Sequence, residues 1–173
     1  MAKLISKSYG LALFEFAIEN QMEELLFEEV KVLLEVFRMD DGIIYFMKNP
    51  KLTKKEKIEI WENTFGKCFS REFAEFLLVL IRKDRFDQIE GILEDFIQSM
   101  KRYQKIGVVY ISTADPLEEV QKNKIEARLL EITDYEVFEM HYIIDESLLG
   151  GMVLRIGDRV ADKSIKNSLR RMR

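Results

Sequence analysis

Residues 148–164, LLGGMVLRIGDRVADKS, decide how the C-terminal part of this chain folds. In the middle of this stretch, MVLRI, apolar residues occupy every second position, which is the period of a β-strand. Gly157 and Asp158 follow where a two-residue hairpin turn belongs. Phosphate-binding glycines would form a G-x-x-x-x-G-K-S/T or G-x-G-x-x-G pattern between a strand and a helix, and neither pattern is present. We therefore expect Gly150, Gly151, Gly157 and Asp158 to shape backbone turns and to bind no nucleotide.

The rest of the C-terminal half also has strand and helix signals. The run KIGVVYIST predicts a buried strand, and YEVFEMHYIID, with its period of two, predicts another. Between them, Asp115 and Pro116 suit the N-cap and first position of a helix that ends near Ile132. The tail DKSIKNSLRRMR predicts a short basic helix. Residues 106–173 are therefore expected to form a small β-α-β-β-α domain.

The first hundred residues indicate helices with few interruptions. Five segments have helical spacing, Pro50 is expected to end one element, and Thr53 with Glu56 forms a capping box that opens the next. In the first helix two apolar stripes are expected, made of Tyr9, Ala12, Leu13 and Phe16 and of Leu11, Phe14 and Ile18. Residues 1–105 are thus predicted to form a bundle of five to six helices, which makes the fold class α+β.

Composition excludes several classes of protein. The chain has 173 residues, 34% of them charged, a net charge of −4 and no apolar run long enough to span a bilayer. Its start lacks the apolar region of a secretory signal, so we expect a soluble protein in a bacterial cytoplasm. Cys68 and His141 are the only cysteine and histidine, which excludes an internal disulfide and argues against a zinc cluster. We expect no metal and no cofactor.

Candidate catalytic residues are few. His141 is expected on the polar side of its strand, near Glu139 and across from Arg155, where the three could move protons or simply form a cross-strand pair. The pair is favoured, because such a group is more often a cross-strand pair of modest energy. Ser147 lacks both a nearby base and a G-x-S-x-G elbow, so it is not expected to be a nucleophile. We therefore expect no catalytic residue.

Two surface features point to binding. A basic tail, made of Lys163, Lys166, Arg170, Arg171 and Arg173, would suit a nucleic-acid-binding or ribosome-associated module. Net acidity and the absence of interleaved aromatic residues for base stacking disfavour that alternative. The basic residues have another explanation, since cations also stabilise the C-terminal end of a helix. By contrast, the helices at 6–19 and 70–83 have more apolar surface than one core contact uses, which indicates a groove for another helix.

Four motifs in the right order resemble the delta subunit of bacterial F-type ATP synthase, the homologue of the mitochondrial oligomycin-sensitivity-conferring protein. They are SYGLALFEFA, FMKNPKLTKKEKIEI, FLLVLIRKDRF and, most specific, IDESLLGGMVLRIGDRVADKSIKNSLRRM. The resemblance spans nearly the whole chain. Gly10 stands where the family usually has alanine, and Lys163 and Asn167 also depart from its pattern.

The resemblance implies a non-catalytic stator subunit in the peripheral stalk. Its helical domain would hold the amino-terminal helix of the alpha subunit, and its C-terminal domain the end of the b-type stalk helices, so that proton translocation is coupled to ATP synthesis. The implied location is the cytoplasmic face of the bacterial plasma membrane, with membrane contact only through the complex. By resemblance, the groove for the alpha helix lies between the first and fifth helices and is mapped to Tyr9, Ala12, Leu13, Phe76, Val79 and Lys83.

Overall fold

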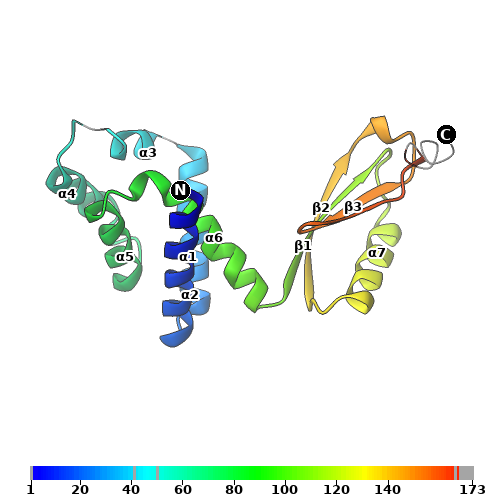
Figure 1. The fold of residues 1–173 in the computed structure, drawn as a ribbon, viewed down its shortest axis with the longest axis horizontal. Helices are drawn as coiled ribbons and strands as arrows, with labels where there is room; N and C mark the ends of the chain where they lie inside the picture. Colours follow the sequence, from blue (N-terminus) through cyan, green and yellow to red (C-terminus); the bar gives the residue numbers. More distant parts are fainter. Residues whose placement is uncertain (1, 41, 50, 166, 168–173) are drawn as a thin grey trace. The chain divides into compact units, whose positions relative to one another are not determined.

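The computed structural model describes all residues except 1, 41, 50, 166 and 168–173. Within that part of the chain, seven α-helices and two short 3-10 helices accompany one four-stranded sheet (Figure 1). The predicted α+β class, with the helices first, is confirmed. The chain divides into two compact units, residues 1–100 and 101–173. Whether 1–105 and 106–173 fold as separate domains stays a prediction.

The first unit is the predicted helical bundle. Its helices are α1 (Ala2–Glu19), α2 (Glu23–Met39), α3 (Gly42–Met47), α4 (Lys54–Phe65), α5 (Arg71–Arg82), the 3-10 helix η1 (Phe86–Gln88) and α6 (Ile89–Tyr103), whose last residues belong to the second unit. The predicted capping box opens α4: Thr53 Oγ1 accepts from the Glu56 N–H at 3.3 Å, and Glu56 Oε2 accepts from the Thr53 N–H at 2.8 Å. Pro50 lies outside the described residues.

The stripe of α1 that faces the core differs from both predicted stripes. The buried residues of α1 are Ser6, Gly10, Leu13 and Ala17, and only Leu13 was among those expected. Gly10 explains the difference. A Cβ there would lie 2.8 Å from Ile92 O and 2.8 Å from the Asp95 Cβ, so α1 approaches α6 as closely as a glycine allows. Alanine at this position would collide with α6.

A hydrogen bond from Ser70 ties α5 to α2. Its Oγ donates to Glu29 Oε2 at 2.7 Å and accepts from the Phe73 N–H at 3.4 Å, which caps α5. Close by, ring contacts of edge-to-face, tilted and stacked geometry connect α4, α5 and η1. They join Trp61 to Phe65 and Phe86, and Phe69 to Phe65 and Phe73.

The second unit is a mixed sheet with one helix on it. Its elements are β1 (Ile106–Thr113), α7 (Glu119–Ile132), β2 (Val137–Ile144), the 3-10 helix η2 (Glu146–Leu148), β3 (Met152–Ile156) and β4 (Arg159–Asp162). The strand order is β2-β1-β3-β4. β1 pairs with β2 in parallel and with β3 antiparallel, and β3 pairs with β4 antiparallel. The β-α-β-β-α order expected from the sequence contained three strands, so β4 is an additional strand. The basic helix expected at 162–173 falls largely outside the described residues.

The start of α7 corrects a sequence-based expectation. The helix begins at Glu119, and its N-cap is Glu118, which forms a reciprocal capping box with Gln121. The expected cap, Asp115, lies upstream, where its carbonyl accepts from Thr113 Oγ1 at 2.8 Å. This bond holds the chain in a turn directly after β1, so the helix starts later than Pro116 suggested.

Two of the four motif residues form the hairpin turn. Ile156 pairs with Arg159, which leaves Gly157 and Asp158 as a two-residue loop, and the Gly157 φ is 55°. Gly151 has a φ of 78°, and a Cβ there would lie 2.3 Å from Lys163 O. A side chain at Gly151 is excluded both by backbone conformation and by space.

The approach of α1 to α6 can be tested with two glycines. We expect Gly10→Ala to lower the free energy of unfolding by about 1 kcal/mol, because the cost of overpacking against α6 is larger than the stability that alanine adds to a helix relative to glycine. Gly91→Ala is the control in α6: its Cβ would meet Ser6 at an ordinary 3.4 Å, so this variant should keep or gain stability. Urea unfolding followed by Trp61 fluorescence measures both. Equal stabilities for the two variants would contradict the close packing at Gly10.

Candidate functional site

The predicted groove residues of the first unit differ in how far they reach the surface. Val79 is 39% exposed, and Ala12 and Lys83 are also exposed. Tyr9 and Phe76 are half-buried and pack against the bundle core. Leu13 is only 2% exposed and belongs to the core, so a partner could reach it only through its neighbours. Whether α1 and α5 form one groove stays a prediction.

The outward face of α1 carries unpartnered apolar side chains. Leu11 and Phe16 are exposed, and so is Leu4, which the sequence analysis did not single out. Its spacing of seven residues from Leu11 could have indicated it. Leu4 and Leu11 share one side of α1 and Phe16 lies on another, and all three lie outside the buried stripe that contains Gly10. α1 therefore presents an apolar surface to solvent.

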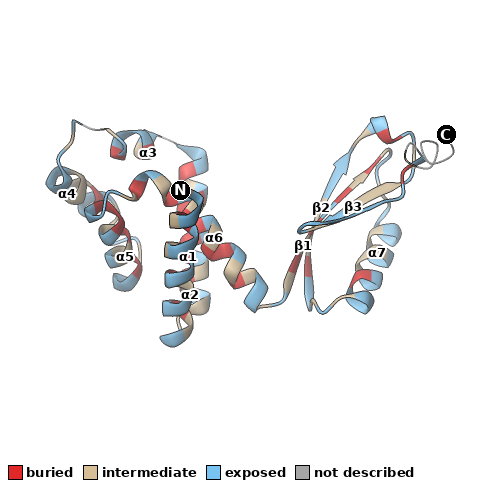
Figure 2. Cartoon of the chain, viewed as in Figure 1, coloured by how far each residue is buried: buried red, intermediate tan, exposed pale blue. Residues whose placement is uncertain are grey.

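The second unit contains a hollow of about 850 Å³ between the end of α7 and the β3–β4 hairpin. Leu129, Leu154 and Ile156 are part of its apolar lining. The hollow exists because α7 covers the sheet incompletely: Leu129 is the one buried residue of this helix, and all four residues of β4 are exposed (Figure 2). Ile132 and Val160, which also line the hollow, are 59% and 60% exposed. The sequence carries no local signal for this site, because its walls come from segments that are far apart along the chain.

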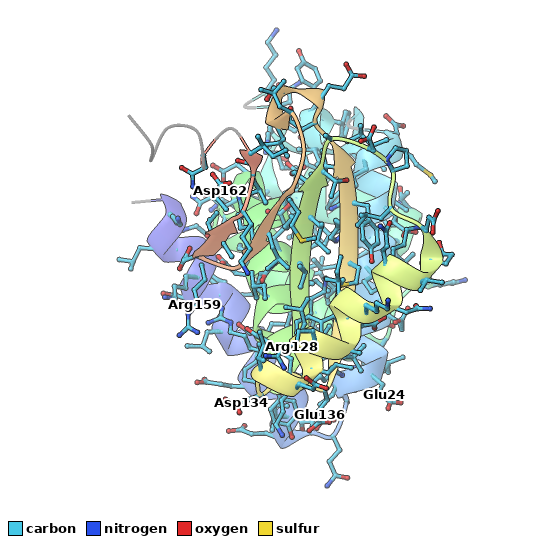
Figure 3. All side chains as sticks on the ribbon, turned by 90° about the vertical axis from the view of Figure 1, so that its right-hand side faces the viewer. Glu24, Arg128, Asp134, Glu136, Arg159 and Asp162 are labelled. Carbon is cyan, nitrogen blue, oxygen red and sulfur yellow. The ribbon has the colours of Figure 1, made fainter. Side chains whose placement is uncertain are left out.

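Charged side chains of both signs surround this hollow. Arg102, Lys105 and Arg159 line it together with Asp134 and Asp158. Figure 3 shows Arg159 on the hairpin and Asp134 just beyond α7. Lys105 Nζ donates to Glu136 Oε1 at 2.7 Å, and this hydrogen bond raises the pKa of the lysine.

His141 lies in a ladder of side chains on the sheet face opposite α7. Its Nε2 is 2.9 Å from Glu139 Oε1, and the other carboxylate oxygen of Glu139 accepts from Lys101 Nζ. The His141 ring stacks on Tyr110, with centroids 4.8 Å apart and planes at 16°. On the next strand, Arg155 Cζ lies 5.4 Å from the Tyr110 ring centroid.

This ladder corrects the expected arrangement of His141. Arg155 is not across from it, because β1 lies between β2 and β3 and Tyr110 pairs with both residues. The proximity of Glu139 to His141 is confirmed. Cys68 is exposed, and its Sγ donates to Thr64 O at 3.7 Å.

Within the described ranges, no group of three or more histidine, cysteine, aspartate or glutamate side chains is placed to hold a metal ion. Among the same residues, no helix is both long and apolar enough to cross a bilayer. Of the basic tail, Lys163 is exposed, while Lys166, Arg170, Arg171 and Arg173 lie outside the part that the structure describes.

Each of the two compact units has an exposed apolar surface, which is typical of proteins that bind other proteins. The family model described as ATP synthase delta (OSCP) subunit matches residues 5–173. The chain belongs to that family. It is 43% identical over 169 residues to ATP synthase subunit delta of Lachnoclostridium phytofermentans, covering 98% of this chain and 93% of the relative. It is 31% identical to the subunit of the same name from Geobacillus, covering 98% and 95%.

A solved structure supports the fold over both units. A chain in the cryo-EM structure of the Toxoplasma gondii mitochondrial ATP synthase hexamer superposes with a TM-score of 0.74 at 20% identity, covering 96% of this chain and 94% of that chain. Family membership confirms the resemblance drawn from the motifs. The chain is a non-catalytic stator subunit of F-type ATP synthase. It works with other subunits of that complex, which is membrane-associated.

The side-chain ladder makes stability depend on pH. The hydrogen bond from Lys101 lowers the pKa of Glu139 in the folded state. A lowered pKa stabilises the fold above the unfolded value of about 4.3, and this contribution disappears as pH falls through the folded value. We expect Glu139→Gln to cost less than about 1 kcal/mol at pH 7, since the pair is partly solvated. The cost should decrease as the pH falls from 7 to 3, as measured by hydrogen exchange in β1 and β2.

Glu136→Gln is the control, because it removes the fully exposed pair with Lys105. It should change exchange in these strands less at every pH. An effect of Glu139→Gln that is equal at pH 7 and pH 3 would contradict the role of the ionised ladder.

Proposed function

We propose that this chain joins the catalytic head to the stalk by holding one helix at each of its two apolar surfaces. The alpha subunit's amino-terminal helix would bind at α1 and α5, and the C-terminal end of a b-type stalk helix would bind in the hollow of the second unit. The observation that carries the proposal is the presence of a separate exposed apolar surface in each compact unit of a delta-family chain.

The surface on α1 and α5 suits the apolar face of an amphipathic helix. Phe16 and Val79 are exposed apolar side chains on the two helices to which the family resemblance assigns the groove. Tyr9 and Phe76, half-buried, would form its base and keep a partner in register. Leu13 would then support the site from the core, without touching the partner.

The hollow suits the end of a helix. Its apolar lining would take side chains from the last turns, and Ile132 and Val160 would lose their exposure to water. The C-terminus of a helix carries partial negative charge, which the cations of Arg102, Lys105 and Arg159 would complement. Asp134 and Asp158 on the same border would exclude a strongly acidic partner.

Such a subunit performs no chemistry, and its task is mechanical. Rotation inside the complex would turn the catalytic head unless the head is held, so the binding free energy at both ends limits the torque that the tether resists. The site would lie at the cytoplasmic face of a bacterial plasma membrane, peripheral to it, without nucleotide or nucleic acid as ligand.

Binding of the alpha helix can be tested with a peptide of about twenty residues, long enough for a 30 Å helix. We expect Val79→Asp to weaken binding at least about tenfold, because a charge would be buried unpaired, and Tyr9→Ala to weaken it less. Val32→Asp, the same change at an exposed valine of α2, should bind like wild type. Fluorescence anisotropy of the labelled peptide gives the affinities. Equal affinities for Val79→Asp and Val32→Asp would remove the groove from α5.

Salt separates this proposal from the nucleic-acid alternative. An apolar groove should bind the peptide almost equally at 50 and 200 mM salt, whereas binding to phosphates weakens steeply over about that range.

Binding of the stalk can be tested by measuring how well ATP hydrolysis is coupled to proton pumping. We expect a reconstituted complex that contains Val160→Asp to hydrolyse ATP at a near-normal rate and to acidify vesicles several-fold less, because the head is no longer held. Val120→Asp is the control: this valine of α7 is 61% exposed, close to the 60% of Val160, and does not line the hollow. Hydrolysis and lumen acidification are recorded together. Equal pumping by the two variants would exclude the hollow as the stalk anchor.

A further inference from the structure

The two edges of the sheet in the second unit differ in how well they are protected against pairing with another strand. β4, at one edge, has four residues and carries Arg159 and Asp162 at its ends. β2, at the other edge, has eight residues, VFEMHYII, without a lysine or a proline. Exposed edge strands are usually short, or carry lysine or proline, because their unpaired backbone groups bind other strands. β2 has none of these features, and no strand among the described residues pairs with its outer side.

The backbone groups that β2 presents on its outer side follow from its pairing with β1. The N–H of Asp145, directly after β2, donates to Thr113 O of β1 at 2.8 Å. Successive residues of a strand turn their backbone groups to alternate sides, so the odd-numbered residues of β2 face β1. The N–H and C=O groups that point away from the sheet belong to Phe138, Met140, Tyr142 and Ile144.

β2 is complementary to itself in an antiparallel register centred on Met140. Antiparallel strands bond through residues that direct their backbone groups at each other, and Met140 opposite Met140 of a second copy meets this condition. Glu139 then lies opposite His141 of the second copy, and Val137 lies opposite its Ile143. Val137 and Ile143 are 55% and 47% exposed, and in this register they would cover each other.

Registers centred one residue to either side lack this complementarity. A pair of strands centred on Glu139 would bring two carboxylates together, and a pair centred on His141 would place Val137 opposite the Asp145 carboxylate. Like charges directly opposite each other destabilise a strand pair, whereas opposite charges stabilise it. The side chains of β2 therefore favour the register centred on Met140.

The sheet face toward α7 is compatible with the same register. Phe138 would lie opposite Tyr142 of the second copy, and such aromatic pairs stabilise neighbouring strands. Phe138 belongs to the core under α7, whereas Tyr142 is 39% exposed. Because opposite residues of paired strands lie on the same face, the α7 helices of both copies would cover the same face of the joined sheet.

We propose that β2 is the binding surface for a second copy of this chain. The two copies join edge to edge about a twofold axis at Met140, and their sheets become one sheet of eight strands, four from each copy. No residue of β2 lines the hollow, and none belongs to the groove assigned to the alpha helix. The proposal therefore concerns the free chain and does not rest on the proposed function.

Sedimentation equilibrium of the full-length chain measures this association. One strand per copy forms a small interface, so we expect a reversible dimer with a dissociation constant of roughly 0.1 mM. Val137→Lys with Ile143→Lys should weaken association at least about tenfold, because like charges would lie opposite each other. The control is Val160→Lys with Ile165→Lys, in and after β4, where the two side chains are 60% and 48% exposed. This control should associate like wild type.

A charge exchange makes the test independent of folding. Val137→Glu with Ile143→Glu should also associate weakly, by repulsion. An equimolar mixture of the glutamate and lysine variants should form a heterodimer at least as tight as the wild-type dimer, because each lysine then faces a glutamate. The proposal is overturned if the wild-type chain stays monomeric at ten times the expected dissociation constant, or if the lysine variant associates like wild type. A mixture that stays monomeric would overturn the assigned register.

Discussion

The contact of α1 with α6 at Gly10 determines which side chains of α1 face the core and which face solvent. Because a Cβ at Gly10 would lie 2.8 Å from Ile92 O, the two helix axes come closer than any larger residue permits. That approach fixes the rotation of α1 about its own axis. Ser6, Leu13 and Ala17 then face inward, and Leu4, Leu11 and Phe16 remain outside. The apolar surface proposed for the alpha helix thus follows from one missing methyl group.

In the second unit the corresponding constraint is the incomplete cover of a four-stranded sheet by one helix. α7 is the crossover between the parallel strands β1 and β2, so it packs near these two strands and buries only Leu129. The face of β3 and β4 toward the same side therefore keeps a hollow that is lined by Leu154 and Ile156. The topology of the second unit thus leaves apolar surface open to solvent beside α7.

The opposite sheet face is ordered by polar contacts. Tyr110, at the centre of the sheet, has His141 stacked on it from β2 and the Arg155 cation over its ring from β3. Glu139 links His141 to Lys101, and this lysine belongs to the last part of α6. What resembled a proton-handling group in the sequence is a structural ladder across three strands. It shows how a lone histidine beside a glutamate can serve packing without taking part in catalysis.

The sequence by itself determined the elements and the family, because these depend on local signals. Helical spacing predicted the bundle. Thr53 and Glu56 predicted the start of α4, and Gly157 with Asp158 predicted the position of the hairpin loop. Both of these signals are local, since caps and tight turns involve residues three or fewer positions apart. Only the tertiary structure decided the rest. The inward face of α1 depended on its contact with α6, about eighty residues away. The neighbour of His141 across the sheet depended on the strand order. The start of α7 depended on the hydrogen bond from Thr113 Oγ1 to the Asp115 carbonyl, which competes with an N-cap at Asp115. The hollow of the second unit could not be predicted, because space between elements is a property of their packing and leaves no period in the sequence.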